Sequence, residues 1–240
     1  MIKKGNNIEK VREINQEWIN ELSEEKEIKD SILVYEPFTK DYWEEKYRIL
    51  WYNLEPGGYI ENENDKVLKP ESYKKLLEKK NLTIINTSLF IYYLYNKLNG
   101  IEIDENKIDD ARKNYNLLME YMNKVTYMNL LKDCGKSDLE KKWFWRFFNT
   151  NVYPKNRERT ININNALDPD ILIVTGSDGY ELFQQLYNKK FDKNFTFVHN
   201  NTLFASLHHP SSRGGGWNKG YIPKYVNIIM ENMKINNLLK

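Results

Sequence analysis

Polar side chains that could do chemistry follow several short apolar runs in this 240-residue chain. Glu55 is the first of them, and it stands directly before Pro56 and two glycines. Proline fixes φ and glycine permits positive φ, so the carboxylate sits on a tight turn that a ligand can approach closely. A carboxylate there can orient a water molecule or stabilise developing positive charge. It can equally be an ordinary solvated turn residue, so Glu55 alone does not define a site.

Asn129 and His209 follow two further apolar runs. The Asn129 amide offers a donor and an acceptor, which match the amide-like edge of a pyrimidine. His209 is followed by Pro-Ser-Ser, whose hydroxyl and backbone N–H groups suit a phosphate. Each residue also has a plain structural interpretation: Asn129 as a cap at a strand end, and His209 with its neighbour His208 as residues that close a loop. Only their order and spacing together can carry a functional argument.

The apolar runs that position these residues are short and rich in β-branched or aromatic residues, which predicts strands over 32–35, 49–52, 82–85, 125–130, 171–174 and 202–207. Helical patterns lie between several of them, over 70–79, 88–97, 109–122, 138–148 and 180–188. Strands alternating with helices call for right-handed crossovers and a parallel sheet. We therefore predict a three-layer α/β/α fold with a mostly parallel central sheet of about four strands. In such a sheet ligands bind beyond the carboxyl ends of the strands.

No Pro/Gly-rich linker and no repeat divides the chain, which predicts a single α/β domain over residues 1–240. Within it we expect an N-terminal helical and edge-strand extension over 1–45 and a core over 47–233. The extension contains an amphipathic helix over 8–29, which would cover a sheet; its apolar stripe consists of Ile8, Val11, Ile14, Trp18 and Leu22. The asparagine cluster at 162–165 is interpreted as a loop or cap.

The formal net charge of +2 gives the chain no overall field that would attract a polyanion. A nucleic-acid partner must therefore be held by a local basic surface, and two stretches qualify. Residues 141–159 carry six Lys/Arg against one Glu, and residues 207–225 carry three basic residues and no acid. The aromatic residues within 141–159 could stack on unpaired bases, or they could form the buried face of an amphipathic helix.

Cys134 is the only cysteine, which excludes intrachain disulfides and multi-cysteine zinc sites and is typical of a reducing compartment. The first ten residues lack the apolar stretch of a signal peptide. The richest apolar run, 89–95, is far shorter than the roughly 20 residues that span a bilayer. We expect a soluble, cytoplasmic protein with no membrane partner.

The order and spacing of four segments resemble the motifs of the uracil-DNA glycosylase superfamily. The first motif of that superfamily, a strand running into a Gly-x-Asp-Pro or Gly-x-Asn-Pro-Gly type turn, would be ILWYNLEPGG at 49–58. The segment TYMNLLK at 126–132 resembles a strand of that superfamily that ends in an asparagine-containing segment. The segment DPDILIVTG at 168–176 resembles a strand of that superfamily that follows a proline and ends in glycine. The last motif, a strand running into His-Pro-Ser, resembles FASLHHPSS at 204–212. The similarity covers about residues 47 to 233.

This resemblance implies a fold like that of uracil-DNA glycosylases and a role for each matching residue. Glu55 would hold the place of the residue that positions the hydrolytic water, His209 would steady the leaving base, and Asn129 would read the flipped base, with Asn53 and Tyr59 as further base-binding candidates. Residues that would contact the DNA backbone or fill the gap in the helix follow the last motif; they are Ser211, Ser212, Arg213, Trp217 and Lys219.

The physical chemistry of N-glycosidic bond cleavage fits this constellation. Cleavage builds positive charge on the sugar and negative charge on the departing base, so a carboxylate on one side and a hydrogen-bond donor on the other stabilise both halves. The base must first leave the stack, which costs a few kcal/mol and requires a pocket. The glycine-rich stretch 214–221, with Trp217, would supply flexibility and an aromatic ring to fill the gap. Such a reaction requires no metal or organic cofactor.

The first motif departs from the family pattern. Asn53 stands where a glycine is usual, Glu55 stands where Asp or Asn is commoner, and Gly57 stands where many members carry a tyrosine, the nearest tyrosine here being Tyr59. These changes do not specify which base is excised, and a wider pocket could admit thymine-like or bulkier modified bases. A second segment, 31–38, also ends in Glu-Pro, so Glu36 is the alternative for the functional acid.

Two functional hypotheses therefore follow from the sequence. The first is a monomeric, monofunctional DNA glycosylase that removes uracil or another modified base from single- or double-stranded DNA and leaves an abasic site. The second is a catalytically inactive protein of the same fold that binds nucleic acid or a nucleotide, for example as a defence or regulatory sensor. An unrelated nucleotide-binding α/β protein is disfavoured, because no Gly-x-Gly-x-x-Gly or phosphate-loop lysine motif follows a strand.

Overall fold

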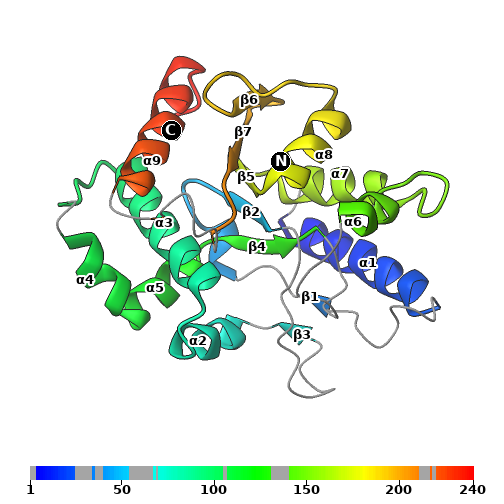
Figure 1. The fold of residues 1–240 in the computed structure, drawn as a ribbon, viewed down its shortest axis with the longest axis horizontal. Helices are drawn as coiled ribbons and strands as arrows, with labels where there is room; N and C mark the ends of the chain where they lie inside the picture. Colours follow the sequence, from blue (N-terminus) through cyan, green and yellow to red (C-terminus); the bar gives the residue numbers. More distant parts are fainter. Residues whose placement is uncertain are drawn as a thin grey trace.

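A five-stranded sheet with strand order β4-β2-β5-β7-β6 forms the centre of the molecule (Figure 1). The computed structural model describes residues 4–24, 34–35, 40–53, 67–68, 70–104, 107–130, 141–210, 217 and 220–240. Its strands are β2 (Ile49–Asn53), β4 (Thr126–Asn129), β5 (Ile171–Thr175), β6 (Thr196–His199) and β7 (Thr202–Leu207). All pair in parallel except β6, which is antiparallel to β7. The prediction of an α/β chain with a mostly parallel sheet is confirmed, with β6 as an additional strand.

Both faces of this sheet are buried, which is why its strands are continuous apolar runs. Successive side chains of a strand point to opposite faces. Ile49 and Trp51 accordingly belong to one hydrophobic cluster, whereas Leu50 and Tyr52 belong to the other. Strand β5 divides in the same way between the two clusters. The sheet therefore needs helices on both sides.

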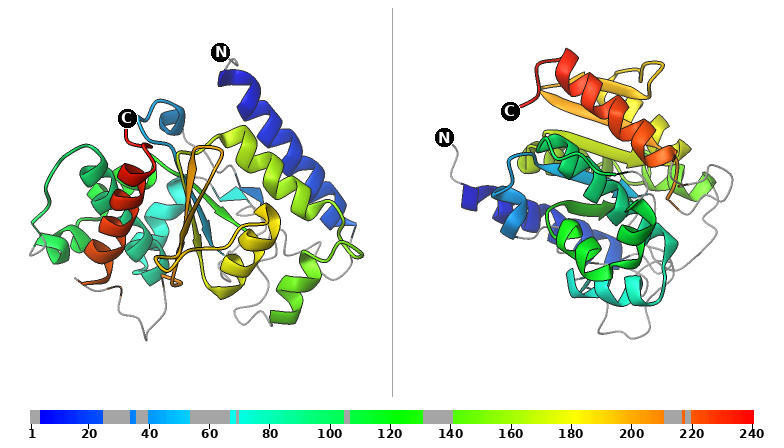
Figure 2. Two further views of the ribbon diagram at one scale, coloured as in Figure 1. Left: turned by 90° about the horizontal axis from the view of Figure 1, so that it is seen from above. Right: turned by 90° about the vertical axis from the view of Figure 1, so that its left-hand side faces the viewer.

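Helices cover each face and give the three-layer α/β/α arrangement (Figure 2). One face is covered by α2 (Pro70–Glu78), α3 (Leu82–Leu98), α4 (Ile108–Lys113), α5 (Tyr115–Met122) and α9 (Tyr221–Ile235). The other carries α1 (Lys4–Ser23), α6 (Lys141–Phe147), α7 (Asn156–Leu167) and α8 (Ser177–Tyr187). The remaining elements are the short strands β1 (Val34–Tyr35) and β3 (Val67–Leu68) and a 3-10 turn, η1 (Lys40–Trp43).

Helix α1 packs alongside α7 on the face of the sheet that also carries α6 and α8 (Figure 2). The predicted apolar stripe is the buried one: Val11, Trp18 and Leu22 share a hydrophobic cluster with residues of the sheet, and Ile8 and Ile14 pack at its margin. An ion pair reinforces the contact, because the Arg159 guanidinium on α7 meets the Glu21 carboxylate at 2.7 Å.

Two predicted elements are wrong because capping and helix signals outweigh local composition. Residues 82–85 are the first turn of α3 and not a strand, because the Asn81 side chain accepts a hydrogen bond from Ile84 N at 3.1 Å and caps the helix. The helix predicted over 109–122 is broken into α4 and α5 at Asn114, whose side chain caps α5 through Leu117 N.

Asparagines explain two further differences. The cluster at 162–165 lies inside α7 and not in a loop; Asn164 is tolerated there because it accepts from Tyr52 OH at 2.7 Å and donates to Tyr187 OH at 2.8 Å. Strand β6 was missed altogether. Asn200 and Asn201 join β6 to β7 as a two-residue hairpin loop, and both adopt the left-handed conformation that asparagine tolerates.

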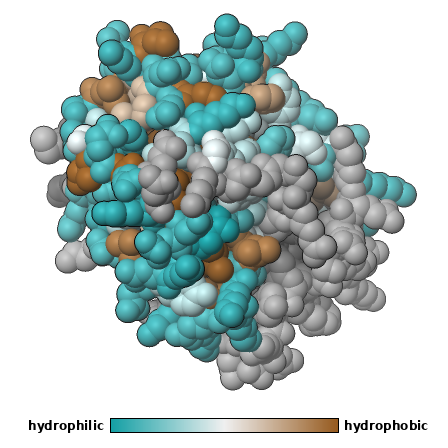
Figure 3. Space-filling model, turned by 60° about the vertical axis from the view of Figure 1, so that its left-hand side comes forward, coloured by the Kyte–Doolittle hydropathy of each residue, from teal (hydrophilic) through white to brown (hydrophobic). Residues whose placement is uncertain are grey.

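The described residues of the strand predicted over 32–35, Val34–Tyr35, form β1, which pairs with β3 in a separate two-stranded sheet. It is therefore not an edge strand of the main sheet. The described part of the chain contains no helix that is both long and apolar enough to cross a membrane. The face shown in Figure 3 is largely hydrophilic, with apolar patches separated by polar side chains, in keeping with a mean hydropathy of −0.74.

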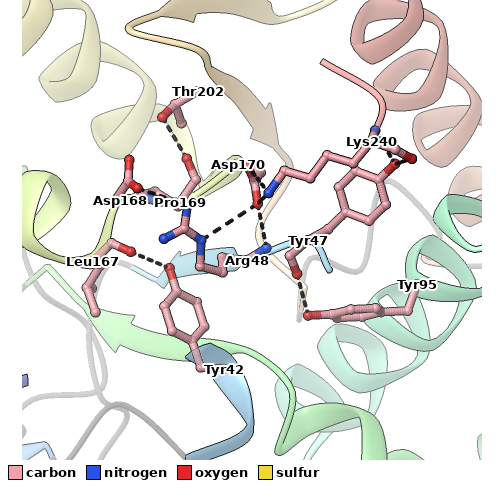
Figure 4. Close-up of polar contacts among 10 residues, drawn as sticks. All are labelled: Tyr42, Tyr47, Arg48, Tyr95, Leu167, Asp168, Pro169, Asp170, Thr202 and Lys240. Atoms are coloured by element: carbon pink, nitrogen blue, oxygen red, sulfur yellow. Dashed lines mark hydrogen bonds and ion pairs between the residues drawn. The ribbon is translucent and has the colours of Figure 1, made fainter. Parts of the chain in front are cut away.

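A polar network holds the amino edge of the sheet together (Figure 4). Just before β2, the Arg48 backbone N–H donates to the Asp170 carboxylate at 2.8 Å, and its guanidinium pairs with Asp168 at 2.9 Å. Lys240 reaches the same Asp170 carboxylate at 2.8 Å, and its backbone N–H donates to Tyr47 OH. The amino edge is thereby occupied with structural contacts, which leaves the opposite edge for a ligand.

Candidate functional site

The carboxyl edge of the sheet collects the four strand ends that the sequence singled out. Asn53 at the end of β2 is in register with Asn129 at the end of β4. On the other side of β2, β5 ends at Thr175, which is in register with Leu207 at the end of β7. The chain goes from β2 to β4 in one direction and returns across β2 to β5, so the strand order reverses between β2 and β5. Such a switch point is where open α/β sheets bind ligands.

A hydrogen-bonded cluster of side chains fills the switch point. The Thr175 hydroxyl donates to Asn53 Oδ1 at 2.8 Å, and Trp51 Nε1 donates to the same oxygen at 3.1 Å. The amide nitrogen of Asn53 donates to the Tyr127 hydroxyl. Asn53 is buried, and its amide oxygen is thus already engaged on both sides by the protein. These contacts fix the side chain of Asn53 at the carboxyl edge of the sheet. The sequence had predicted that Asn53 binds a base.

Asn129 is also buried, beside Asn53 on the neighbouring strand. Strand β4 stays paired with β2 up to its last residue, because Leu130 N donates to Asn53 O at 2.8 Å. Asn129 therefore lies at the last paired position of β4. The residues that follow it, 131–140, are outside the described part.

His209 lies two residues beyond the end of β7, on a segment that other elements hold tightly. Consecutive backbone groups are fixed from three directions: His208 N donates to Tyr221 OH at 2.9 Å, Trp217 Nε1 donates to His209 O at 3.0 Å, and Asn86 Nδ2 donates to Pro210 O at 2.7 Å. Tyr221 comes from α9 and Asn86 from α3. The imidazole therefore projects from an immobilised backbone.

Burial lowers the pKa of His209 below its ordinary value of about 6.5, because the charged imidazolium loses hydration there. The imidazole is consequently neutral at pH 7. A neutral imidazole has one N–H donor and one acceptor nitrogen.

Trp217 lies in the core at this edge, although the sequence suggested that it would meet DNA. Its side chain is only 4% exposed, and its indole packs against Trp51, Phe90 and Tyr221 with ring centroids 6.4, 5.8 and 4.7 Å away. The Trp217 carbonyl also accepts from the Arg112 guanidinium at 2.6 Å. The residue thus anchors the segment that holds His209, and its ring is not presented for stacking on a base.

Several predicted site residues lie outside the described residues. They are Glu55, its alternative Glu36, Tyr59, Ser211, Ser212, Arg213 and Lys219. Glu55 follows the end of β2 by two residues in the sequence. The residues that the structure does bring together at that edge are Asn53, Asn129, His209 and Trp217.

The basic stretch 141–159 is only partly available to a partner. Lys142, Arg146 and Lys155 are exposed on α6 and at the start of α7. Arg157 and Arg159 instead make internal contacts: Arg157 Nε donates to Phe148 O at 2.7 Å, and Arg159 is buried against Glu21. The aromatic rings of Phe144, Phe147 and Phe148 are in the core, which confirms the amphipathic-helix interpretation for these three residues.

A pocket of about 220 Å³ opens at the same edge, between the ends of β5 and β7. Its lining comes from four segments of the chain and consists of Gly176, Ser177, Tyr180, Phe195, Ser206, Leu207, His208 and Tyr225. The sequence pointed to Gly176, at the end of the segment 168–176, and to His208, but not to the aromatic walls. No spacing in the sequence could have revealed them, because Tyr180, Phe195 and Tyr225 meet only through the packing of α8, the start of β6 and α9.

The described residues contain no group of three or more His, Cys, Asp and Glu side chains placed to hold a metal ion. Searches against known proteins found no matching protein-family model and no similar curated protein.

Proposed function

We propose that this protein is a DNA glycosylase that flips uracil or another modified base out of DNA and hydrolyses its N-glycosidic bond. The observation that carries the proposal is the immobilised segment His208–Pro210, which holds a neutral imidazole at the same carboxyl edge of the sheet as the strand ends that bear Asn53 and Asn129. Preorganised donors of this kind stabilise charge that develops in a transition state, because they need no reorganisation when the reaction occurs.

In the proposed reaction, the bond between the sugar C1′ and the base nitrogen breaks, and its electron pair leaves with the base. The N–H of neutral His209 donates to a carbonyl oxygen of the departing base and stabilises this negative charge. A water molecule oriented by Glu55 adds its oxygen to C1′, and the proton that it releases offsets the one that the base takes up. Asn129 pairs with the edge of the flipped base. The products are a free base and an abasic site.

The test is cleavage by the purified protein of single and double strands that contain uracil, hypoxanthine, xanthine or a modified cytosine. Alkali-labile sites in at least one substrate are expected. His209→Ala should lower the rate about 10²- to 10³-fold, which is the usual cost of losing one transition-state donor. Full activity of His209→Ala on every cleaved substrate would refute its proposed role.

The functional acid is identified by comparing Glu55→Gln with Glu36→Gln, which keep the shape of each side chain and remove its charge. We expect Glu55→Gln to lose cleavage and Glu36→Gln to retain it. The reverse pattern would assign the role to Glu36 and overturn the first-motif assignment at residues 49–58.

A second candidate function is binding of nucleic acid or a nucleotide without cleavage. The hydrogen bonds that Asn53 makes within the protein favour binding without cleavage, because this residue of the first motif then serves the fold and not a substrate. A gel mobility assay separates the two functions. A shifted band without any alkali-labile site across the substrate panel would favour the binding protein.

A further inference from the structure

We propose that the pocket between β5 and β7 binds a second, unpaired nucleobase of the DNA strand, next to the base that is extruded. The inference rests on the proposed function for bringing a DNA strand to this edge. It concerns a different set of side chains from His209, Asn129 and Glu55, so it can be tested separately.

The walls of the pocket suit a flat aromatic ring. Tyr180, Phe195 and Tyr225 contribute three aromatic side chains around a volume of about 220 Å³. Tyr180 is held in place by stacking on Phe191 at 4.8 Å, and Tyr225 is held by stacking on Tyr221 at 4.3 Å. Rings fixed in this way lose little entropy when a base stacks on them. Base–aromatic stacking is the main sequence-tolerant contact by which proteins hold unpaired bases.

Phe195 meets Tyr180 edge-on, with the ring centroids 6.3 Å apart, and it occupies an unusual backbone position. Its side chain is 45% exposed at the pocket, and its backbone has a φ of 60°, a conformation that a bulky residue rarely adopts. Surrounding contacts impose this conformation: Phe195 N donates to Asp192 O at 3.0 Å, and Ser206 N donates to Phe195 O at 2.9 Å. Asparagine or glycine would fit the turn better. A phenylalanine here is unfavourable for the fold, and a ring that meets a ligand explains it.

Ser206 supplies a polar group inside the pocket. It lies on β7 with the same parity as Phe204, which places its side chain on the α8 side of the sheet. The residue is only 7% exposed and lines the pocket. A hydroxyl group both donates and accepts hydrogen bonds, so it could bind an N–H or a carbonyl group of a base.

The location of the pocket connects it to the strand. Leu207 and His208 line it, and His209 is the next residue. A nucleotide adjacent to the one held at His209 would therefore lie close to the pocket. Bases that are neighbours in a strand are a few ångströms apart when stacked, about the rise of one step of a duplex.

The experiment uses a short single strand with the fluorescent base 2-aminopurine next to uracil, and free 2-aminopurine 5′-monophosphate as the second arm. The full chain should quench the labelled strand on binding, because 2-aminopurine fluorescence falls when the base stacks. Phe195→Asn should weaken this binding about five- to a hundredfold, the range for loss of one stacked aromatic. Ser206→Ala should weaken it about two- to tenfold.

Leu239→Asn is the matched control, because Leu239 is 42% exposed, close to the 45% of Phe195. It is next in sequence to Lys240, whose side chain belongs to the network at the amino edge of the sheet, opposite the pocket. It should leave binding of the labelled strand unchanged. Phe195→Asn should also unfold at the same temperature as the wild type or higher, because asparagine tolerates its positive φ. A lower unfolding temperature with unchanged binding would make Phe195 structural and overturn the inference.

Product formation in the same mixtures keeps the two proposals apart. Quenching that depends on Phe195, without any abasic product, would refute the glycosylase proposal for uracil and leave the pocket supported. Abasic product with quenching that Phe195→Asn does not change would refute the pocket. Quenching of the free nucleotide but not of the strand would also overturn the inference, because the ligand would then be a mononucleotide.

Discussion

Asn86 on α3 donates its amide hydrogen to the carbonyl of Pro210 at 2.7 Å, which joins residues 124 positions apart in the sequence. Asn86 is buried, and its other amide atom, Oδ1, has no hydrogen-bond partner among the described residues. A buried polar group of this kind is retained only where its single contact matters or where a ligand completes it. The contact here fixes the residue that directly follows His209.

Asn86→Ala is expected to lower the cleavage rate about tenfold or more, since small misplacements of a catalytic group are costly. The free energy of unfolding should fall by about 1 to 3 kcal/mol, as for the loss of one partner of a buried hydrogen bond. Urea denaturation and single-turnover kinetics measure the two effects. Asn99→Ala is the control, because Asn99 Nδ2 also donates to a backbone carbonyl, that of Tyr95, at the other end of α3. Equal rate losses in both variants would contradict a positioning role for Asn86.

Trp217 should behave as a core residue. Trp217→Ala is expected to lower the free energy of unfolding by about 3 to 5 kcal/mol, because it leaves a large cavity among Trp51, Phe90 and Tyr221. Trp217→Phe keeps an aromatic ring and removes the hydrogen bond to His209 O, so about 1 kcal/mol is expected. Chemical denaturation checks both values. A variant that loses DNA affinity at unchanged stability would instead place Trp217 at the DNA, as the sequence suggested.

The stability of the protein should depend on His209 in acid. Its folded-state pKa is lowered by burial, so below pH 6.5 the unfolded chain binds a proton more readily than the folded chain. The contribution of a neutral His209 is therefore complete above about pH 6.5 and is lost as the pH falls toward its folded pKa. The difference in unfolding free energy between wild type and His209→Gln should shrink between pH 7.5 and pH 5. A difference that is constant over this range would show that burial does not perturb the imidazole.

Thr175 should stabilise the switch point through its hydroxyl. Thr175→Val preserves the shape and removes the donor to Asn53 Oδ1, and we expect a loss of about 1 to 2 kcal/mol in unfolding free energy. Thr175→Ser retains the hydroxyl and should lose less stability than Thr175→Val. Thermal or urea unfolding of the three proteins measures this order, and the opposite order would mean that the methyl group matters more than the hydrogen bond.

The class of the fold could be predicted from the sequence because it depends on local patterns. The run 171–174 is apolar without interruption, which is typical of a strand buried on both faces. The alternation of strands with helices then required a mostly parallel sheet, which in turn required the strand ends with Asn53, Asn129 and Thr175 to meet at one edge. These steps need only periodicity and chain connectivity.

Long-range packing decided the rest. The sequence could not show that the amide of Asn164 would be satisfied inside a helix by Tyr52 and Tyr187, because both partners are distant in the chain. It could not show that Trp217 turns inward to hold His209, since an aromatic residue among glycines suits an exposed loop equally well. The aromatic pocket also arises only where α8, α9 and the turn before β6 converge. Sequence thus determined which residues end the strands, whereas tertiary structure decided which side chains face a ligand, because that depends on contacts between segments far apart in the chain.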